Sequence, residues 1–479
     1  MDVDALVIGA GFGGLGAAVT RSAAGERVVL CEALTYPGGC ASTFTKHGDQ
    51  FESGATLASG LAPGQLFDRW LDRAGVTVDH EPLDPAMVVR TPGWELPIDG
   101  DRAAFIERLC ALPDAPVRGI REFFGLQQRV AETLWPLLDD PLRTLPHRSL
   151  VFHLQRSLGY LPLLGLLGRP LTQVMERFGV ASFEPLRVAM DSLCQITVQC
   201  MAHEAEAPFA LSAIDYGFRG AAHVDGGMGA LASALCEVVR KQGGEVRFAS
   251  RVKELRREGA HWVAETRTGR LRARRVYANL LPGDLNDLAG LQSSSLRRRQ
   301  ERVEQGWGAV MRYGRVTHGV LDCPSAYHLE LVGQPGEPLH SGNHVFLSVG
   351  PETAEGRSIT ASTHTRIDDT PAQTTDLVQE QLGRTLASCA PELDCVQWMT
   401  GSPRTFQRFT RRSRGWVGGI PRRAGLGQYL DIGVPQPATG LYLVGDSVFP
   451  GQSALAAASE TLSTSRPSAL ALSAERLPS

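Results

Sequence analysis

The chain lacks the patterns that mark secreted, membrane-spanning or nucleic-acid-binding proteins. Its nine cysteines are scattered and odd in number, without a Cys-x-x-Cys pair, which favours buried thiols in a reducing compartment over a disulfide framework. No apolar run has the length of a membrane-spanning helix, and no charged and apolar leader precedes the first apolar segment. The formal net charge of −3 gives no electrostatic reason to expect nucleic acid as a partner. We therefore expect a cytoplasmic protein that is not secreted.

What is present is the composition of an ordinary folded protein. Hydrophobic residues make up 43% of the chain and charged residues 21%, which excludes a disordered chain. With 479 residues the chain is too long for one small core, so we expect two or more domains.

The strongest local pattern lies at the start of the chain. Residues 2–8 form a short apolar segment typical of a strand, and the glycine-rich run GAGFGG follows at residues 9–14. Residues 15–24 are small and compatible with a helix, and residues 27–31 are a second apolar segment that ends at Glu32. This order predicts a βαβ unit with the dinucleotide-binding fingerprint in its first turn.

Each position of the fingerprint has a physical reason. Gly9 permits the tight turn, Gly11 lets the backbone approach a pyrophosphate, and Gly14 lets the helix lie close to the strand. The helix N-terminus offers unpaired N–H groups to the phosphates. Glu32 can accept hydrogen bonds from both ribose hydroxyls of an adenosine, and it would repel a 2′-phosphate. We therefore expect a dinucleotide cofactor other than NADP.

Two further glycine-containing segments follow. Gly38 and Gly39 come directly after the acidic residue, where they can form a second backbone wall against the pyrophosphate; an ordinary Pro-Gly turn is the alternative. Residues 51–56 (FESGAT) form a turn of small residues that could lie against a flat ring.

Together these motifs resemble the flavoprotein superfamily of amine oxidases and phytoene desaturases. Within it, residues 51–76 (FESGATLASGLAPGQLFDRWLDRAGV) are similar to bacterial carotenoid desaturases that act at the end of a polyene. The resemblance implies an α/β fold: a Rossmann-like FAD/NAD(P)-binding domain with a discontinuous substrate domain of mixed sheet and helices. Relatives usually carry Arg or Lys after the Gly-Gly pair, whereas this chain has Cys40, which leaves one flavin-phosphate contact to backbone N–H groups.

The last motif is GLYLVGDSVFPGQSALAAASE. An apolar strand over residues 441–444 ends in Gly445-Asp446, and a loop of small residues leads into a helix that begins near Ser453. By the resemblance, Asp446 would accept a hydrogen bond from a ribityl hydroxyl, and the helix N-terminus would face the flavin N1 and C2 oxygen. Val252, after the helix at residues 226–240, would hold the adenine with its backbone. The expected cofactor is FAD, and its expected contacts are Gly9, Gly11, Phe12, Gly13, Gly14, Glu32, Gly38, Gly39, Cys40, Gly54, Ala55, Thr56, Val252, Gly445, Asp446, Ser453 and Ala454.

The resemblance also divides the chain. Residues 1–85, 216–305 and 405–479 are expected to form the FAD-binding domain, and residues 86–215 and 306–404 a membrane-facing substrate domain. Strands are expected on both sides of the turn at residues 92–98, and over residues 312–316 and 344–349. Helices are expected over much of residues 101–178 and over residues 375–390. Two or three strands of a small accessory sheet are expected over residues 251–278, with residues 276–279 rejoining the main sheet.

Several polar groupings have two interpretations. Seven arginines fall within residues 404–423, which indicates a solvated face or a contact with anionic lipid, and the embedded Trp416-Val417-Gly418-Gly419 resembles the approach to the substrate side of the flavin. His340 and His344 are four residues apart without a nearby carboxylate or cysteine, and His203 cannot share a helix face with Glu204 and Glu206. We expect no metal site.

The uncharged segment at residues 158–168 (LGYLPLLGLLG) is either a core helix of the substrate domain or a cap that dips into one leaflet of a membrane. A hydrocarbon substrate dissolved in the bilayer favours the cap. We therefore expect peripheral association with the inner face of the cell membrane.

The implied activity is dehydrogenation of a carotenoid end group, of the C-3′,4′ type, with quinone or oxygen as the electron acceptor. The polyene can delocalise an intermediate cation, so a strong base is not required and no catalytic residue is assigned. Cis–trans isomerisation of a polyene on reduced flavin is the alternative. Amine oxidation would need an aromatic cage and a polar path for the amine, and a non-enzymatic escort protein would not keep an intact fingerprint.

Overall fold

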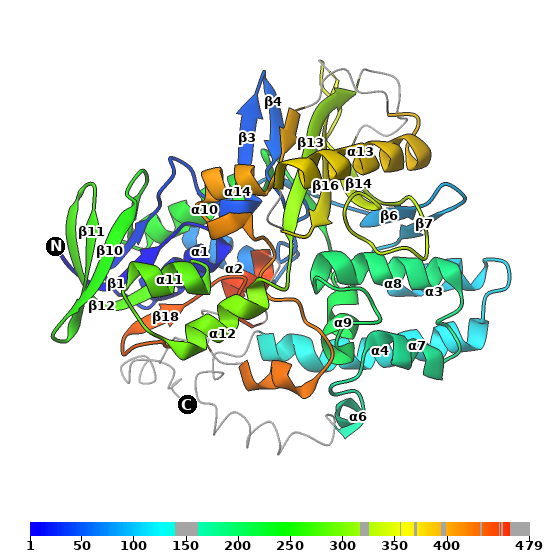
Figure 1. Ribbon diagram of the computed structural model, residues 1–479, viewed down its shortest axis with the longest axis horizontal. Helices are drawn as coiled ribbons and strands as arrows, with labels where there is room; N and C mark the ends of the chain where they lie inside the picture. Colours follow the sequence, from blue (N-terminus) through cyan, green and yellow to red (C-terminus); the bar gives the residue numbers. More distant parts are fainter. Residues whose placement is uncertain are drawn as a thin grey trace, which may run out of the picture.

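A computed structural model of the chain describes residues 1–138, 161–316, 325–354, 356–367, 371–393, 399–431, 434–449, 451 and 454–459. Two seven-stranded sheets organise these residues. Figure 1 shows the first sheet at the left of the view, the second at the upper right, and a group of helices below the second sheet.

The first sheet has the strand order β10-β11-β12-β1-β2-β9, with β18 also pairing with β12. Its parallel part comes from three distant parts of the chain: β1 (Asp2–Ile8), β2 (Val28–Cys31), β9 (Glu245–Arg247), β12 (Gly269–Ala278) and β18 (Leu441–Leu443). Alternate side chains of β1 pack into the hydrophobic cores on the two sides of the sheet, because successive side chains of a strand point to opposite faces. Ala5 and Val7 lie with apolar residues of α1 (Phe12–Ala23) and α10 (Gly227–Lys241). Leu6 and Ile8 lie with residues of α11 (Pro282–Leu288) and α12 (Ser294–Val303).

The strands expected to form a separate accessory sheet are part of this first sheet. β10 (Val252–Glu258) and β11 (His261–Thr266) form an antiparallel pair, and β11 continues onto β12. Ala273 of β12 lies opposite both Trp262 of β11 and Val3 of β1. The expectation of an accessory sheet is therefore wrong, because the long strand β12 pairs with β11 as well as with β1. The return of the chain to the main sheet is confirmed for residues 276–278, which pair with β1 and β18.

The second sheet is mainly antiparallel and has the order β17-β13-β16-β15-β14-β6-β7. Its strands are β6 (Met87–Arg90), β7 (Glu95–Ile98), β13 (Gly308–Val316), β14 (Tyr327–Val332), β15 (His344–Val349), β16 (Arg357–Thr365) and β17 (Met399–Gly401). The expected hairpin around residues 92–98 and the expected strands at 312–316 and 344–349 are confirmed. α13 (Pro371–Cys389), expected over residues 375–390, packs on one face through Leu382 and Leu386.

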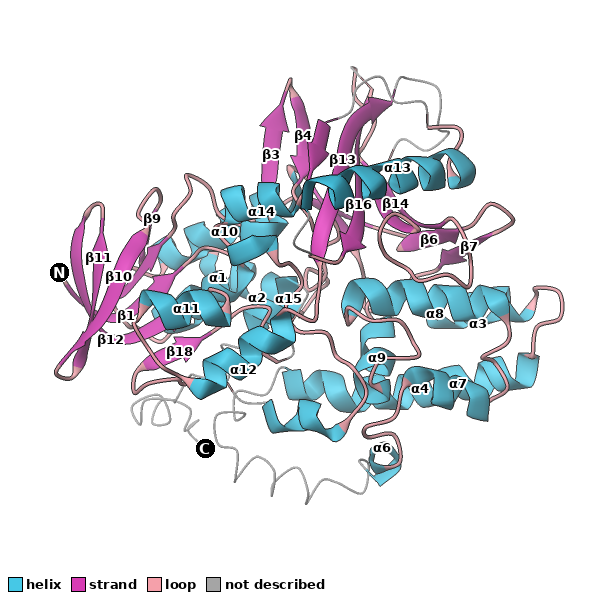
Figure 2. Cartoon of the chain, in the orientation of Figure 1, coloured by secondary structure: helices cyan, strands magenta, loops and turns pink. Residues whose placement is uncertain are grey.

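Helices cover the other face of the second sheet, as Figure 2 also shows. They are α3 (Arg102–Cys110), α4 (Val117–Leu138), α6 (Leu161–Leu164), α7 (Leu171–Arg177), α8 (Glu184–Thr197) and α9 (Ala207–Ile214). Their apolar side chains form the largest core cluster with Met87, Val89 and Val332 of the sheet. The helices expected between residues 101 and 178 are confirmed for the described part of that stretch.

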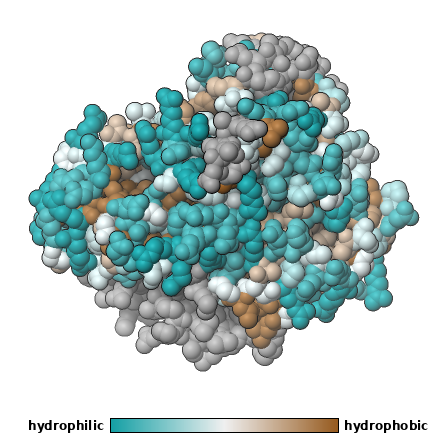
Figure 3. Space-filling model, viewed as in Figure 1, coloured by the Kyte–Doolittle hydropathy of each residue, from teal (hydrophilic) through white to brown (hydrophobic). Residues whose placement is uncertain are grey.

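The remaining elements connect these layers. They are the ribbon of β3 (Thr43–Lys46) and β4 (Asp49–Glu52), the pair of β5 (His80–Pro82) and β8 (Ala222–Val224), and the helices α2 (Leu66–Ala74), α14 (Pro403–Thr410) and α15 (Ala454–Ser459). Figure 3 shows a largely hydrophilic surface with smaller apolar areas on the face in view. Across the described ranges, no helix combines the length and the apolar character needed to cross a membrane.

Candidate functional site

A cavity of about 1350 Å³ lies where the carboxyl ends of the parallel strands meet the second sheet. Ile8, Cys31 and Asn279 line it from the ends of β1, β2 and β12, and Met311 and Phe346 line it from the second sheet. Ordinary ligand pockets measure about 300–1,000 Å³, so this one has room for a large cofactor and a second molecule. Ligands of open α/β sheets bind at this carboxyl edge.

Most of the residues expected to contact a cofactor line this cavity. They are Gly9, Gly11, Phe12, Gly13, Glu32, Gly38, Gly39, Cys40, Gly54, Ala55, Thr56, Val252, Asp446 and Ala454. Gly14 and Gly445 are not among the lining residues, and Ser453 lies outside the described residues.

The glycine turn is built as the sequence predicts. Gly9 has φ +92°, a left-handed conformation that favours glycine, and Gly11 is the N-cap of α1. A Cβ on Gly14 would lie 1.9 Å from the carbonyl oxygen of Gly9, and a Cβ on Gly13 would lie 2.5 Å from the Cα of Gly445. The missing side chains of Gly14 and Gly445 therefore allow close packing. The glycine turn near the N-terminus lies directly against the Gly445 backbone of the C-terminal motif.

Glu32 directly follows β2 and is buried, and backbone N–H groups hold its carboxylate. Its Oε2 accepts a hydrogen bond from the Ala10 N–H (2.7 Å), and its Oε1 accepts one from the Leu34 N–H (2.8 Å). Burial raises the pKa of Glu32, and the backbone hydrogen bonds oppose that rise. An ionised carboxylate has about four acceptor positions, so both oxygens retain capacity for ribose hydroxyls.

The Gly-Gly segment lies against the fingerprint turn. The Gly38 N–H donates to the Ala10 carbonyl oxygen (2.8 Å), and a Cβ on Gly39 would lie 3.3 Å from the Cα of Gly11. Cys40 lines the cavity next in the chain, and burial raises the pKa of its thiol. The two glycine segments thus form adjoining walls made of backbone.

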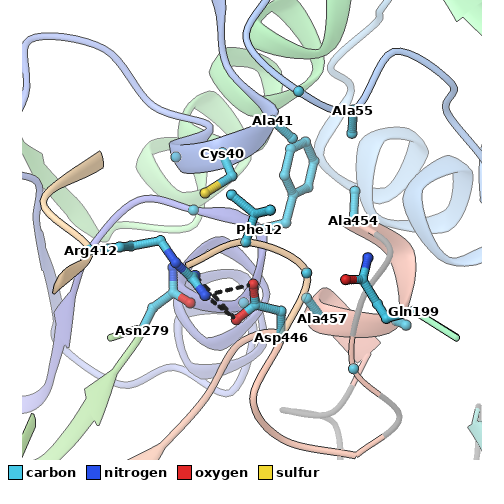
Figure 4. Close-up of a pocket in the computed structure, with 18 of the residues that line it drawn as sticks. Phe12, Cys40, Ala41, Ala55, Gln199, Asn279, Arg412, Asp446, Ala454 and Ala457 are labelled. Atoms are coloured by element: carbon cyan, nitrogen blue, oxygen red, sulfur yellow. Dashed lines mark hydrogen bonds and ion pairs between the residues drawn. The ribbon is translucent and has the colours of Figure 1, made fainter. Parts of the chain in front are cut away.

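Asp446 is paired with Arg412, a residue that the sequence analysis did not single out (Figure 4). The Arg412 Nη2 lies 3.0 Å from the Asp446 Oδ2, and its Nε donates to the Trp416 carbonyl oxygen (2.6 Å). Arg412 also interacts electrostatically with Cys40, whose thiol pKa it acts to lower. A cation therefore lies beside Cys40, the residue that follows the Gly-Gly pair.

The interpretation of the arginine cluster as a solvated face or a lipid contact is wrong for two of its members. The Arg412 side chain is only 16% exposed, and Arg422 is buried, donates to the Val448 carbonyl oxygen (3.2 Å) and lines the cavity. Charge density along the chain could not reveal this, because burial depends on which other segments close over each side chain.

Asn279 is a second residue that sequence reasoning missed. Its backbone N–H donates to the Ile8 carbonyl oxygen (2.9 Å), which places it at the carboxyl end of β12. Its side chain is so close to the glycine turn that a Cβ on Gly11 would lie 2.5 Å from its Nδ2. A polar residue directly after a parallel strand was the available signal.

The cavity continues away from the glycine turn into a mostly apolar region. Its apolar lining residues include Leu57, Leu134, Trp135, Leu163, Leu164, Leu167, Ile196, Phe209, Met311, Phe346 and Phe449. A few polar side chains interrupt this lining, among them Gln199, His344 and His364. Residues 193–218 contribute to both the cavity wall and the core: Gln199 and Phe209 line the cavity, and Leu193 and Leu211 are core.

The segment at residues 158–168 is described from residue 161 onward. Leu163 and Leu166 are buried in the core cluster of the helices, whereas Leu164 is 61% exposed. Residues 158–160 lie outside the described residues. This short stretch therefore contains both core and surface leucines, and Leu163 and Leu164 also line the cavity.

No group of three or more His, Cys, Asp or Glu side chains in the described part of the chain is arranged to hold a metal ion. Glu204 pairs with Arg423 (3.1 Å), and Glu206 caps α9 by accepting from the Phe209 N–H.

Comparison with known proteins agrees with this architecture. Residues 7–74 match the NAD(P)-binding Rossmann-like domain family. The solved structure of an oxidoreductase from Methanosarcina mazei superposes with a TM-score of 0.67 at 17% identity, covering 97% of this chain and 99% of that chain. Putrescine oxidase superposes with a TM-score of 0.61 at 16% identity, covering 97% and 98%. At these identities the likeness shows the fold alone.

Two groups of relatives share more sequence. The chain is 28% identical to a phytoene desaturase (neurosporene-forming) of Rhodobacter capsulatus over 272 residues, which is 52% of this chain but only 47% of that protein. It is 24% identical to prolycopene isomerase 2 of an Oncidium hybrid cultivar over 513 residues, covering 95% of this chain and 82% of that protein. The chain thus has an FAD/NAD(P)-binding Rossmann-like fold like that of the amine oxidases, and it is homologous to phytoene desaturases and prolycopene isomerases.

Proposed function

We propose that this chain is an FAD-dependent oxidoreductase that desaturates a carotenoid, with C-3′,4′-type dehydrogenation of a polyene end group as its reaction. The observation that carries the proposal is the continuity of the cavity. It runs from the glycine turn, where a dinucleotide fits, to a wall of leucine and aromatic side chains that suits a hydrocarbon. We also propose that residues 1–85, 216–305 and 405–479 form the FAD-binding domain, and that residues 86–215 and 306–404 form the substrate domain.

The residues at the glycine end fit FAD. The N-terminus of α1 would offer backbone N–H groups to the diphosphate, and Glu32 would accept hydrogen bonds from the adenosine ribose. Arg412 and Asp446 line the same cavity and would offer a positive charge and a hydrogen-bond acceptor to the cofactor. When bound, the flavin would supply a two-electron acceptor for hydride. The protein's part is to hold the polyene against it, to exclude water with apolar walls, and to accept the accompanying proton.

Cis–trans isomerisation of a polyene on reduced FAD is a second candidate, and the alignments favour it on one point. The match to the prolycopene isomerase covers 95% of this chain, whereas the match to the phytoene desaturase covers 52%. Amine oxidation has less support, because the similarity to amine oxidases is confined to the fold.

We further propose that the protein binds peripherally to the inner face of the cell membrane and receives its substrate there. The exposed Leu164 lies beside cavity-lining leucines, so a lipid-dissolved substrate would have a short path into the cavity. Quinone or oxygen would then reoxidise the flavin.

The test is to express the chain in cells that make lycopene-type precursors and to record pigment absorbance and mass. A red shift with loss of two hydrogens supports desaturation. A changed isomer ratio at constant mass supports isomerisation instead. Unchanged pigment, with FAD-loaded protein present, rejects both.

A further inference from the structure

One face of the second sheet carries a group of titratable side chains at the apolar end of the cavity. Glu330 of β14 lies directly opposite Phe346 of β15, and residues two apart on a strand share a face, so His344 lies on that face too. Ser362 of β16 lies opposite Phe346, which puts His364 on the same face. Of these residues, His344, Phe346, Ser362 and His364 line the cavity.

His344 and Glu330 form a buried hydrogen-bonded pair. The Nε2 of His344 meets the Oε2 of Glu330, and the two side chains are 2% and 0% exposed. Among the described residues, Oε1 of Glu330 has no hydrogen-bond partner. Burial raises the pKa of Glu330, and the neighbouring His344 opposes that rise. A lone buried charge is costly, so the pair is suited to take up one proton and to share it between the two side chains.

The imidazoles near this pair lack such a carboxylate. His364 hydrogen-bonds with the Gln199 amide (3.2 Å), and burial lowers its pKa to about 3, with His344 and His340 adding to the effect. Burial also lowers the pKa of His340, and that of His328 on β14 to about 3. Among the described residues, Glu330 and His364 are therefore the titratable groups shown to interact with His344, and only Glu330 stabilises a cationic ring.

The pair is linked through His364 and Gln199 to the segment expected at the substrate side of the flavin, residues 416–419. A Cβ on Gly418 would lie 2.3 Å from the Nε2 of Gln199, so the Gln199 side chain lies against that segment. Gln199 in turn contacts His364, the electrostatic neighbour of His344. Figure 4 draws Gln199 among the lining residues together with Ala454 and Ala457 of α15.

We propose that His344, positioned by Glu330, is the proton acceptor for dehydrogenation of the polyene. This inference rests on the proposed function. When bound, the oxidised flavin would supply the two-electron acceptor for the hydride that one C–H bond of the substrate loses. The C–H bond of the neighbouring carbon loses a proton to the cavity-facing nitrogen of His344, and its electron pair forms the new double bond. The Glu330 carboxylate stabilises the resulting imidazolium through Nε2–H, and the proton then leaves to solvent.

Three variants of the FAD-loaded protein test the proposal: His344→Gln, Glu330→Gln and, as a matched control, His328→Gln. His328 lies on the same sheet face as Glu330 and is not among the cavity-lining residues. Thermal unfolding and bound FAD are measured first, and only variants that keep both are compared. Single-turnover reduction of the flavin by the polyene is then followed without oxygen between pH 5 and pH 9.

We expect His344→Gln to slow flavin reduction about 10²–10⁴-fold and to remove its rise with pH, as for the loss of a general base. Glu330→Gln should slow it less and shift the pH profile, and His328→Gln should leave rate and profile unchanged. Equal rates and pH profiles in wild type and His344→Gln would overturn the proposal.

A second measurement does not depend on turnover. In the substrate-free, FAD-loaded protein labelled with ¹⁵N-histidine, the neutral His344 ring should carry its proton on Nε2, where it meets Glu330, and Glu330→Gln should change the chemical shift of that proton. A neutral His344 ring with its proton on the cavity-facing nitrogen instead overturns the proton acceptor. If no polyene reduces the wild-type flavin, the proposed function fails, and this measurement alone decides whether the cavity-facing nitrogen is free to accept a proton.

Discussion

Arg412 and Asp446 form an ion pair in the wall of the cavity, with Nη2 of the guanidinium 3.0 Å from Oδ2 of the carboxylate and each side chain 16% exposed. Asp446 belongs to the C-terminal Gly-Asp motif, and Arg412 comes from the end of the α14 segment. Arg412 fixes the orientation of the carboxylate and places its positive charge next to Cys40.

Arg412→Ser should weaken FAD binding by about 10- to 150-fold, because it removes a charge-assisted interaction of about 1.5–3 kcal/mol. Adding Cys40→Arg should restore part of the affinity, since it returns a cation to the adjoining position. Arg408→Ser, an exposed residue of α14, is the control for loss of one positive charge. Dissociation constants from flavin fluorescence check this. An Arg412→Ser protein that binds FAD as tightly as Arg408→Ser would remove Arg412 from the cofactor site.

Glu32→Ala should also lower FAD affinity, by about 1.5–3 kcal/mol, because the ribose hydroxyls lose a charged acceptor. The same change leaves the Ala10 and Leu34 N–H groups without the acceptor they now have, so the FAD-free protein should also melt at a lower temperature. Glu32→Gln keeps an acceptor oxygen and should be intermediate in both measurements. Unaltered FAD retention in Glu32→Ala would contradict the assignment.

Glu52 should make the protein less stable as the pH rises. Its carboxyl is buried, accepts from the Met228 N–H (2.9 Å) and the Thr43 hydroxyl (2.9 Å), and burial raises its pKa to about 8 from 4.5. The folded state therefore holds a proton that the unfolded state releases above about pH 4.5, so its contribution is complete below that pH and is lost as the pH rises toward 8. Each unit of difference corresponds to about 1.4 kcal/mol.

Urea unfolding of wild type and Glu52→Gln between pH 5 and pH 9 measures this contribution. The free energy of unfolding should fall with pH more steeply in wild type than in Glu52→Gln, since the amide does not titrate. Parallel pH profiles for the two proteins would show that Glu52 is not protonated in the folded state.

Leu164→Ser should weaken binding to liposomes without unfolding the protein, because Leu164 is 61% exposed and loses apolar area only when a membrane covers it. Leu166→Ser is the contrasting variant: its side chain is buried, so the change should destabilise the fold by about 2–5 kcal/mol. Flotation with vesicles and thermal unfolding separate the two effects. If Leu164→Ser floats as well as wild type, the membrane contact lies elsewhere, and the exposed arginines near residue 411 are tested next.

The sequence alone determined the local elements. The turn at Gly9–Gly14 needs a residue with a left-handed backbone conformation and a close contact between helix and strand. Glycine meets both needs, so the function of these glycines could be predicted from the sequence. The strand before Gly445 and the helix that begins at Ala454 follow likewise from a run of apolar residues and the small residues after it. Such features depend on residues close together in the chain.

Only the tertiary structure decided which distant residues meet. The first sheet pairs Val3 with Ala273, and this pairing made the expected accessory strands part of the main sheet. Arg412 reaches Asp446, and His344 reaches Glu330 across β14 and β15, although nothing in the order of the residues links either pair. Burial and charge pairing depend on the packing of whole layers, so a lone Arg or His in the sequence does not show whether it will be solvated or will line a cavity.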